Sequence, residues 1–328
     1  MRIAIIGATG MLGHHAAIAA ASAGHEPVVV YRNPRSLQQL GDLNCERRQA
    51  DLRDRAAMKS ALAGVDAVIN CAGYYPTLPR PWRKEVQTAT TQMQNFYDAC
   101  ADLPLRKIVY LGGAIALPRR SDGAPGDESL RYAGQPRSRN PYLQVKWALD
   151  EQAHAQAGKG LPVATGIPTM SFGEFDPGNT TGRFILEMAR RSLPGFVDGK
   201  RNVIYAGDAG RGLVRVCEDG RPGERYLLTG ENLTMRQLME KVAKATGAPM
   251  PRTVPLPIAQ ALSAWQTFHY RHLRGPEPKI SESAIAVMSA GQFLDGSKAQ
   301  LELGFQAQVS VDEAIRRALR WFRAKGMV

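Results

Sequence analysis

Cysteine is scarce in this sequence, and long apolar runs are missing from it. The four cysteines, Cys45, Cys71, Cys100 and Cys217, are scattered and show no Cys-x-x-Cys spacing, which argues against a disulfide framework and a zinc site. No apolar run approaches the length needed to span a bilayer, and the strand-like start at Met1 leaves no room for a cleavable leader. We therefore expect a cytoplasmic protein without disulfides or a bound metal.

Acidic residues are outnumbered, since 42 lysines and arginines stand against 30 aspartates and glutamates in a chain of 328 residues. The formal net charge is +12. Such a balance is typical of proteins that bind nucleic acid, an anionic membrane surface or an anionic small molecule. The basic residues are dispersed, so a nucleic-acid partner is not expected. A phosphate-rich cofactor and substrate explain part of the charge.

Short apolar runs alternate with helical patterns through the first half of the chain. "RIAII" precedes a helical pattern over 11–24, and "KIVYL" and "PVATGIP" follow later helical patterns. This alternation, with short connections and right-handed crossovers, predicts a Rossmann-type, doubly wound parallel sheet in the α/β class, with helices on both faces. We assign residues 1–167 to this dinucleotide-binding domain.

The alternation weakens after Pro168, where proline, glycine and arginine become frequent. We therefore expect a smaller C-terminal α/β domain over residues 168–328 that binds the substrate. Segments from about 199–230 are expected to return to the large sheet, and "NVIYA" is the strongest candidate for a returning strand.

The first chemical motif, "GATGMLG", follows a predicted strand and opens a predicted helix. Glycines in this context permit a tight turn and let a pyrophosphate approach the helix N-terminus. A simple turn between strand and helix is the alternative, and the position of three glycines directly after a strand argues against it. The cofactor-binding residues assigned to this motif are Gly7, Thr9, Gly10, Met11, Leu12 and Gly13.

The second predicted strand ends in "VVVYRNPRS", which lacks the carboxylate that would hold the ribose hydroxyls of NAD(H). It offers Arg32 and Arg35 instead, and an arginine can accommodate the 2′-phosphate of NADP(H). The alternative is that both are solvated surface arginines. The pattern favours NADP(H) over NAD(H) as the cofactor.

The third motif, "PYLQVKWALDE", carries Tyr142 and Lys146 four residues apart, on one face of a predicted helix. A tyrosine is a poor acid or base at neutral pH, and a fixed ammonium beside it favours the phenolate. Such a pair can move a proton to or from a substrate oxygen while hydride moves to or from nicotinamide. The same spacing is common on ordinary solvated helices, but here it follows the fifth strand of a dinucleotide-binding fold.

With these motifs the chain resembles the extended short-chain dehydrogenases/reductases of the NAD-dependent epimerase/dehydratase family, over nearly its whole length. It is most similar to the branch of dihydroflavonol reductase-like proteins and hopanoid-associated sugar epimerases. Further stretches similar to that family are "TTGRFI", "NVIYAGDAGRG", "PGERYLLTGENLT" and "LDGSKAQLELGF". The resemblance implies an NADP-dependent oxidoreductase or a nucleoside-diphosphate-sugar epimerase or dehydratase, with Tyr142 and Lys146 as its catalytic residues.

The resemblance also implies cofactor contacts at the ends of several predicted strands. Asp51 and Leu52 correspond to the family's adenine-contacting turn, and "NCAG" corresponds to the cofactor-lining end of strand four. The remaining residues that it assigns to the cofactor are Cys71, Ala72, Gly73, Leu111, Gly112, Lys146 and Pro168.

The chain departs from the family where a hydroxyl is expected. The Ser or Thr that holds the reacting oxygen is replaced by Gly113, the frequent serine before the lysine by Val145, and a helical asparagine by Ala89. One interpretation is an enzyme in which Thr169, Ser121, a water or the substrate supplies the missing group. The other is a non-catalytic NADP(H)-binding sensor or scaffold.

The substrate is expected to lie against the loop 118–140 and the segment 172–183, because loops carry specificity on such a scaffold. A nucleotide-sugar or another hydroxy or keto compound fits this expectation. Arg183 is either an anion contact or a surface arginine. His14 and His15 are expected beside the cofactor rather than on a metal.

Two contacts with other molecules are also expected. The family implies a homodimer through the helices predicted over 85–101 and 142–156. The stretch 256–275 combines an apolar body with a basic end. It is interpreted as a core or subunit-contact helix in preference to a membrane-bound one.

Overall fold

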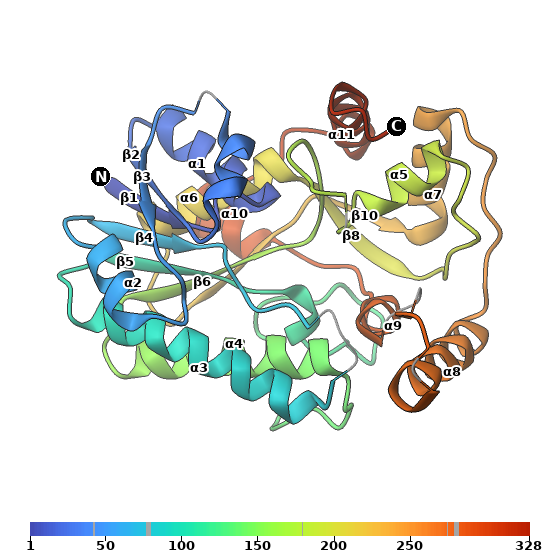
Figure 1. Ribbon diagram of the computed structural model, residues 1–328, viewed down its shortest axis with the longest axis horizontal. Helices are drawn as coiled ribbons and strands as arrows, with labels where there is room; N and C mark the ends of the chain where they lie inside the picture. Colours follow the sequence, from blue (N-terminus) through green and yellow to red (C-terminus); the bar gives the residue numbers. More distant parts are fainter. Residues whose placement is uncertain (42, 77–79, 179, 274, 279–281) are drawn as a thin grey trace.

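The computed structural model of the chain contains a large and a small sheet, each covered by helices (Figure 1). Its described residues are 1–41, 43–76, 80–178, 180–273, 275–278 and 282–328.

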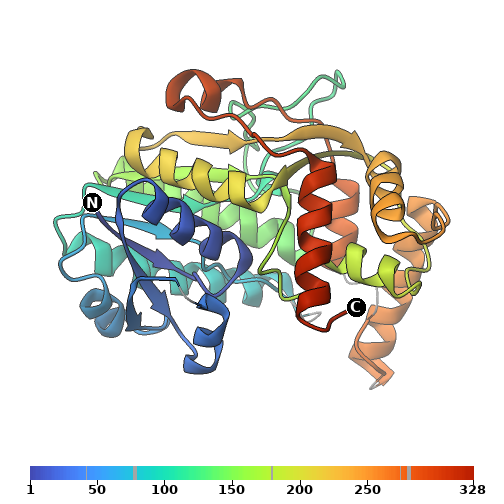
Figure 2. The ribbon, with the colours of Figure 1, turned by 90° about the horizontal axis from the view of Figure 1, so that it is seen from above.

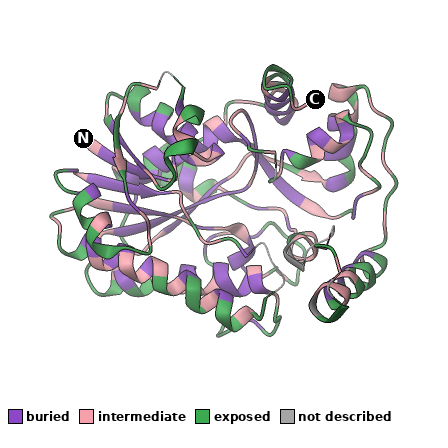
Figure 3. Ribbon diagram, in the orientation of Figure 1, coloured by how far each residue is buried: buried purple, intermediate pink, exposed green. Residues whose placement is uncertain are grey.

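The large sheet has seven parallel strands in the order β3-β2-β1-β4-β5-β6-β9. Their bounds are β1 Arg2–Ile6, β2 Glu26–Tyr31, β3 Glu46–Gln49, β4 Ala67–Asn70, β5 Lys107–Leu111, β6 Val163–Pro168 and β9 Arg225–Leu228. The central strands are mostly apolar because both of their faces are buried (Figure 3). The prediction of a doubly wound parallel sheet is confirmed.

Helices cover the two faces of this sheet according to the alternation of side chains along each strand. On one face, Ile3 and Ile5 pack against helices α1 (Met11–Ser22), α6 (Ala206–Asp219) and α10 (Ser297–Leu303). On the other, Ala4 and Ile6 pack against α2 (Arg55–Ala61), α3 (Trp82–Ala101) and α4 (Pro141–Gly158). Two 3₁₀ helices, η1 (Pro34–Leu40) and η2 (Ala114–Ala116), follow β2 and β5.

The small sheet has three strands in the order β10-β8-β7. Its strands are β7 Met170–Phe172, β8 Lys200–Tyr205 and β10 Glu231–Thr234, and it packs with α5 (Arg183–Ala189), α7 (Met235–Thr246) and α11 (Val311–Ala324). "NVIYA" forms most of β8 here, so the expectation that it returns to the large sheet is wrong. The strand that returns to the large sheet is β9, which follows α6 in the chain; α6 packs on α1. An apolar run predicts a buried strand, but it does not show which of the two sheets the strand joins or which strands it pairs with.

Two further helices lie at the outer end of the molecule, α8 (Leu256–Leu273) and α9 (Glu282–Ser289). Both views of the ribbon show α8 at the edge of the chain farthest from β1 and β2 (Figures 1 and 2). Helix α8 packs on α9, and α9 packs on α4. Within the described ranges, none of the helices is long and apolar enough to cross a membrane.

Candidate active site

Four strands of the large sheet end side by side at one edge. Strands β1, β4, β5 and β6 are parallel neighbours, so Ile6, Asn70, Leu111 and Pro168 mark the same carboxyl edge. The chain runs from β1 outward to β2 and β3 on one side, and continues through β4 on the other. Ligands of open α/β sheets bind at this switch point between β1 and β4.

The turn after β1, residues 7–13, is shaped for a close approach and is called the phosphate turn below. Gly7 has φ +81, and a Cβ built on it would lie 2.9 Å from the Ala72 backbone nitrogen. A Cβ on Gly13 would lie 2.3 Å from the Gly7 carbonyl oxygen. Helix α1 begins without a side-chain cap and without an acidic residue in its first turn. Its first N–H groups therefore fit a pyrophosphate.

Arginines stand near the ends of β2 and β3, where the adenosine end of a dinucleotide would lie. Arg32 and Arg35 are exposed, and within the described ranges neither guanidinium is paired with a carboxylate. Asp51 pairs with Arg53 at 2.7 Å. The Arg53 hydrogen bond lowers the pKa of Asp51, and the Arg32 charge lowers it further.

The turn after β4, residues 71–75, lies between the phosphate turn and helix α4. The Ala72 backbone nitrogen donates to Asn70 Oδ1 at 3.0 Å. A Cβ on Gly73 would lie 3.8 Å from Lys146 Nζ. Burial raises the pKa of Cys71 to about 12, so its thiol stays protonated and is no nucleophile.

Helix α4 presents Tyr142 and Lys146 to this edge. Asn140 caps the helix, accepting hydrogen bonds from the backbone nitrogens of Tyr142 at 3.0 Å and Leu143 at 3.2 Å. Lys146 is buried, and its aliphatic stem lies against Gly113: a Cβ there would be 3.3 Å from Lys146 Cδ. The structure thus brings the Tyr–Lys pair, Gly113 and the turn after β4 to one place.

The electrostatics of the pair differ from the expectation. Burial lowers the pKa of Lys146 to about 8. Burial, and secondarily Tyr75, raises the pKa of Tyr142, and Lys146 does not offset this. The expected stabilisation of the phenolate by the ammonium is therefore wrong for the protein without cofactor, because desolvation outweighs the attraction.

Tyr75 is a neighbour of Tyr142 that the sequence analysis missed. The two rings lie 4.8 Å apart, between centroids, at an interplanar angle of 47°. Tyr75 sits in the turn after β4, and about half of its surface is exposed. No motif spacing links these two residues, so only the fold could reveal the contact.

The position of the missing hydroxyl has an ordinary backbone. Gly113 has φ −144 and ψ 132, an extended conformation that any residue adopts. Gly112 is more constrained, because its Cβ would lie 2.9 Å from Thr165 Cγ2. Of the two suggested substitutes for the hydroxyl, Thr169 donates to Asn202 Oδ1 at 2.8 Å and Ser121 is exposed.

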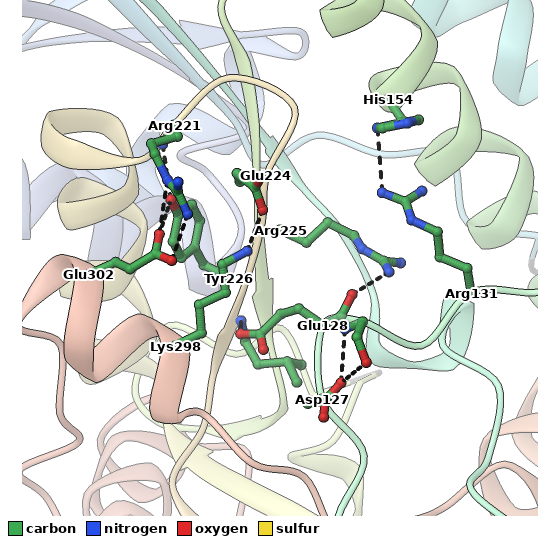
Figure 4. A network of polar contacts seen from close by, with 12 residues as sticks. Asp127, Glu128, Arg131, His154, Arg221, Glu224, Arg225, Tyr226, Lys298 and Glu302 are labelled. Atoms are coloured by element: carbon green, nitrogen blue, oxygen red, sulfur yellow. Dashed lines mark hydrogen bonds and ion pairs between the residues drawn. The ribbon is translucent and has the colours of Figure 1, made fainter.

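The loop 118–140 is anchored in its middle and near its C-terminal end. Gln144 of α4 donates to the carbonyl oxygens of Pro136 at 2.7 Å and Ser138 at 2.6 Å. Arg225 of β9 donates to the carbonyl oxygen of Glu128 (Figure 4). It also donates to the carbonyl oxygen of Leu130, and the Glu128 carboxylate accepts a hydrogen bond from the Leu227 nitrogen. The same guanidinium pairs with Asp150 of α4 in a buried ion pair.

The segment 172–183, of which Asn179 lies outside the described residues, is organised by Asp176. This buried carboxylate accepts hydrogen bonds from the Gly178 nitrogen, the Thr180 hydroxyl and the Gly182 nitrogen. Arg183 is more than half exposed and pairs with Glu187, which matches the alternative of a surface arginine.

The two histidines of α1 join the halves of the molecule. The His14 ring stacks on Phe175, with centroids 3.6 Å apart, and Phe175 has an unusual φ of +63. His15 Nε2 lies 3.7 Å from a Glu174 oxygen. Burial lowers the pKa of His14 to about 4, so its imidazole is neutral. No group of three potential metal ligands forms within the described ranges.

Comparison with known protein families identifies the family of this chain. The model of the NAD-dependent epimerase/dehydratase family matches residues 3–228. The chain belongs to this family. The expected resemblance is confirmed, and the match includes the phosphate turn, the turn after β4, Gly113 and helix α4. The family and the relatives described next are oxidoreductase and epimerase enzymes, so the chain is an enzyme of the extended short-chain dehydrogenase type.

Full-length relatives of this epimerase/dehydratase family member include one solved structure of high similarity. The crystal structure of a nucleoside-diphosphate-sugar epimerase from Pseudomonas aeruginosa is 42% identical, with a TM-score of 0.87, and the match covers 100% of this chain and 99% of that one. Sterol demethylase protein B of Methylococcus capsulatus is 25% identical, and the match covers 100% of this chain and 100% of that protein. A putative dihydroflavonol 4-reductase of Synechocystis is 24% identical over 99% of this chain and 95% of its own length.

Proposed function

We propose that this chain transfers hydride between NADP(H) and a substrate carbon that bears a hydroxyl or keto group, with Tyr142 moving the proton. The observation that carries the proposal is the convergence of Tyr142, Lys146 and the turn after β4 beside the phosphate turn. When bound, NADP(H) supplies or accepts the hydride.

The residues of this chain divide the remaining work. The phosphate turn would hold the pyrophosphate, and the ammonium of Lys146 would hold the nicotinamide ribose. Because its pKa is raised, Tyr142 is a neutral phenol in the protein without cofactor. A neutral phenol can donate its proton to a carbonyl oxygen that is becoming an alcohol, and the phenolate that remains can accept a proton when the reaction runs in the opposite direction.

A nucleoside-diphosphate-sugar is the first candidate substrate. It is supported by the 42% identical epimerase from Pseudomonas aeruginosa and by the net charge of +12, which suits an anionic diphosphate. A hydroxy or keto compound without a diphosphate is the second candidate, favoured by the names of the sterol demethylase and dihydroflavonol reductase relatives.

The decisive experiment measures oxidation of NADPH by the purified protein with a panel of nucleoside-diphosphate-4-ketosugars and uncharged ketones. We expect slow turnover of at least one substrate, and a loss of about 10²–10⁴-fold in Tyr142→Phe. Tyr75→Phe is the matched control, since it removes a neighbouring phenol that transfers no proton in the proposal. Unchanged turnover in Tyr142→Phe would refute the mechanism. Tight NADPH binding without turnover of any substrate would support the sensor or scaffold interpretation.

The preference for NADP(H) over NAD(H) is a separate part of the proposal. It is supported by the exposed, unpaired Arg32 and Arg35 near the end of β2. One charge-assisted phosphate contact contributes roughly 1.5–3 kcal/mol. Calorimetry should show that the preference shrinks in Arg32→Ala and persists in Arg55→Ala, an exposed arginine paired with Asp102 instead. Equal affinities of the parent for the two cofactors would contradict this assignment.

We also propose a homodimer formed through α3 and α4. The two helices are a firmly joined pair, because Gln152 and Gln156 of α4 both donate to Gln94 of α3, at 3.1 and 3.2 Å. Two such pairs can form a four-helix contact across a two-fold axis. Light scattering at micromolar concentration should give twice the mass of the chain, and a monomeric mass would exclude the dimer.

We place the protein in the cytoplasm, a proposal supported by its four free cysteines, which suit a reducing compartment. Fractionation of cells that express the tagged chain should recover it from inside the cell, in the cytoplasmic fraction or bound to the cytoplasmic face of the membrane. Recovery from the medium or the periplasm would contradict the proposal.

A further inference from the structure

Helix α8 turns its large apolar side chains outward and its small ones inward. Ala259, Ser263 and Thr267 lie on its buried side. Trp265 is 62% exposed and Phe268 55% exposed. A helix of a globular protein normally buries the larger apolar residues, because their burial stabilises the fold most. The interior therefore does not explain the apolar residues of α8: of the two expected roles, a core helix is contradicted and a subunit-contact helix stays a prediction.

The exposed residues form one continuous stripe. Ile258, Leu262 and Trp265 follow one another at spacings of four and three residues, which places them on the same side of the helix. Phe268 continues the stripe one turn further on. Aromatic contacts run along it, since Phe268 lies against His272 with ring centroids 4.8 Å apart. We call these four residues and Leu273, which is also exposed, the α8 stripe.

Basic residues outnumber acidic ones in the sequence around the α8 stripe. Helix α8 contains no aspartate or glutamate. The stretch 251–280 contains four lysines and arginines and one acidic residue, Glu277. Arg252 is exposed just before the helix begins, and His272 is exposed in its last turn. The formal net charge of the whole chain is +12.

We propose that the α8 stripe binds the surface of an anionic lipid bilayer, with the helix lying in the plane of the interface. Tryptophan, phenylalanine and leucine on one side of a helix, with basic residues around them, are the features of interfacial helices. Anionic headgroups complement the charge of this end, and the cytoplasmic leaflet carries them. The inference goes beyond the proposed function and does not depend on it.

A second copy of the chain fits this surface less well. A two-fold contact through the α8 stripe would bring together two helices that carry basic residues and no carboxylate. Like charges that face each other across an interface oppose association. Lipid headgroups, in contrast, supply the missing negative charge.

The position of α8 gives the binding a structural consequence. Helix α8 packs on α9, and α9 packs on α4, the helix that carries Tyr142 and Lys146. A bilayer bound to α8 would therefore hold the catalytic helix close to the membrane through two helix contacts.

Sedimentation with lipid vesicles tests the proposal on the full chain. The probes are vesicles of phosphatidylcholine alone and of phosphatidylcholine mixed with phosphatidylglycerol. The parent should bind the anionic vesicles, and the double variant Trp265→Ser, Phe268→Ser should bind them at least tenfold more weakly. Leu301→Ser is the matched control, because Leu301 is 84% exposed on α10 and lies outside the stripe; its binding should be unchanged. Salt should weaken binding, since the screening length falls from about 10 Å at 0.1 M to about 3 Å at 1 M.

Several results would overturn the proposal. They are failure of the parent to bind anionic vesicles, equal binding to neutral vesicles, and an equal loss in Leu301→Ser. A lower mass of the double variant in light scattering would assign the stripe to a second copy instead. A raised KM for a soluble substrate would assign it to the substrate site. Thermal melting checks that the variants fold, and Arg252→Glu, a change at an exposed charge, should weaken binding to anionic vesicles without changing the apolar surface.

Discussion

Two glycine turns meet at the site, and they carry glycine for different reasons. In the phosphate turn, Gly7 has a positive φ, and a Cβ on Gly13 would collide with the Gly7 carbonyl oxygen at 2.3 Å. After β5, Gly113 has an extended backbone, and its Cβ would meet only the flexible stem of Lys146 at 3.3 Å. The backbone requires glycine in the first turn but not at Gly113.

This difference separates a structural requirement from a chemical feature. A serine at position 113 would need a shift of a few tenths of an ångström in the stem of Lys146, and no change of backbone. The absence of the hydroxyl is therefore not forced by the fold. It bears on the proposed proton transfer, and three substitutions around the two turns test the roles of their glycines.

The largest effect is expected for Gly13→Ala. Its Cβ would overlap backbone atoms of the phosphate turn, so α1 must move away from β1. We expect the free energy of unfolding to fall by more than about 3 kcal/mol and NADPH binding to be lost. Thermal melting and calorimetry measure both. Gly158→Ala is the control, because nothing lies within 4 Å of its Cβ; its stability should change by less than about 1 kcal/mol. Similar stabilities of the two variants would remove the basis of the comparison.

An intermediate effect of opposite sign is expected for Lys146→Met. Burial lowers the Lys146 pKa to about 8 from its ordinary 10.5, so the folded chain binds this proton less tightly than the unfolded chain. The resulting penalty is fully present below about pH 8 and disappears as the pH rises toward 10.5. We expect the variant to be more stable than the parent by about 1–3 kcal/mol at neutral pH.

This gain should shrink between these two pKa values, as followed by denaturant unfolding across the pH range. NADPH affinity should fall in the same variant. A constant stability difference at every pH would mean that the ammonium is not the cause.

The smallest effect on stability is expected for Gly113→Ser, within about 1 kcal/mol of the parent, because the backbone already suits serine. Its informative readout is turnover. Removing one donor to a developing oxyanion costs other enzymes about 10²–10³ in rate, so restoring one should raise turnover by about tenfold or more. Gly113→Ala controls for the added Cβ and should not gain activity. An equal gain in the alanine variant would assign the effect to packing against Lys146 and not to the hydroxyl.

Features with short sequence spacing could be predicted from the sequence. The phosphate turn depends on residues within seven positions of each other, and Tyr142 and Lys146 share a helix face because they are four apart. The alternation of short apolar runs with helical patterns was sufficient to predict the parallel sheet, since strands buried on both faces form nearly continuous apolar runs.

Features that join distant segments could not be predicted in this way. The contact of Tyr75 with Tyr142, the stacking of His14 on Phe175 and the hold of Arg225 on the loop 118–140 have no local signature. The lowered Tyr142 pKa expected from the sequence was wrong for a related reason: burial raises this pKa, and burial depends on every segment around the site. For α8, the apolar residues were visible in the sequence, but the side that faces the interior was not.

Strand β9 closes the large sheet, and this has a consequence for the order in which the protein is made. Residues up to Pro168 supply six adjacent strands, yet β6 stays an open edge until β9 leaves the ribosome. Helix α1 likewise lacks its neighbour α6 over that period. A nascent chain stalled near residue 190 should therefore be digested quickly by protease, whereas one stalled well beyond α6 and β9 should resist. We therefore expect the nascent chain to expose the most unpaired strand edge and apolar surface in the interval between these two lengths.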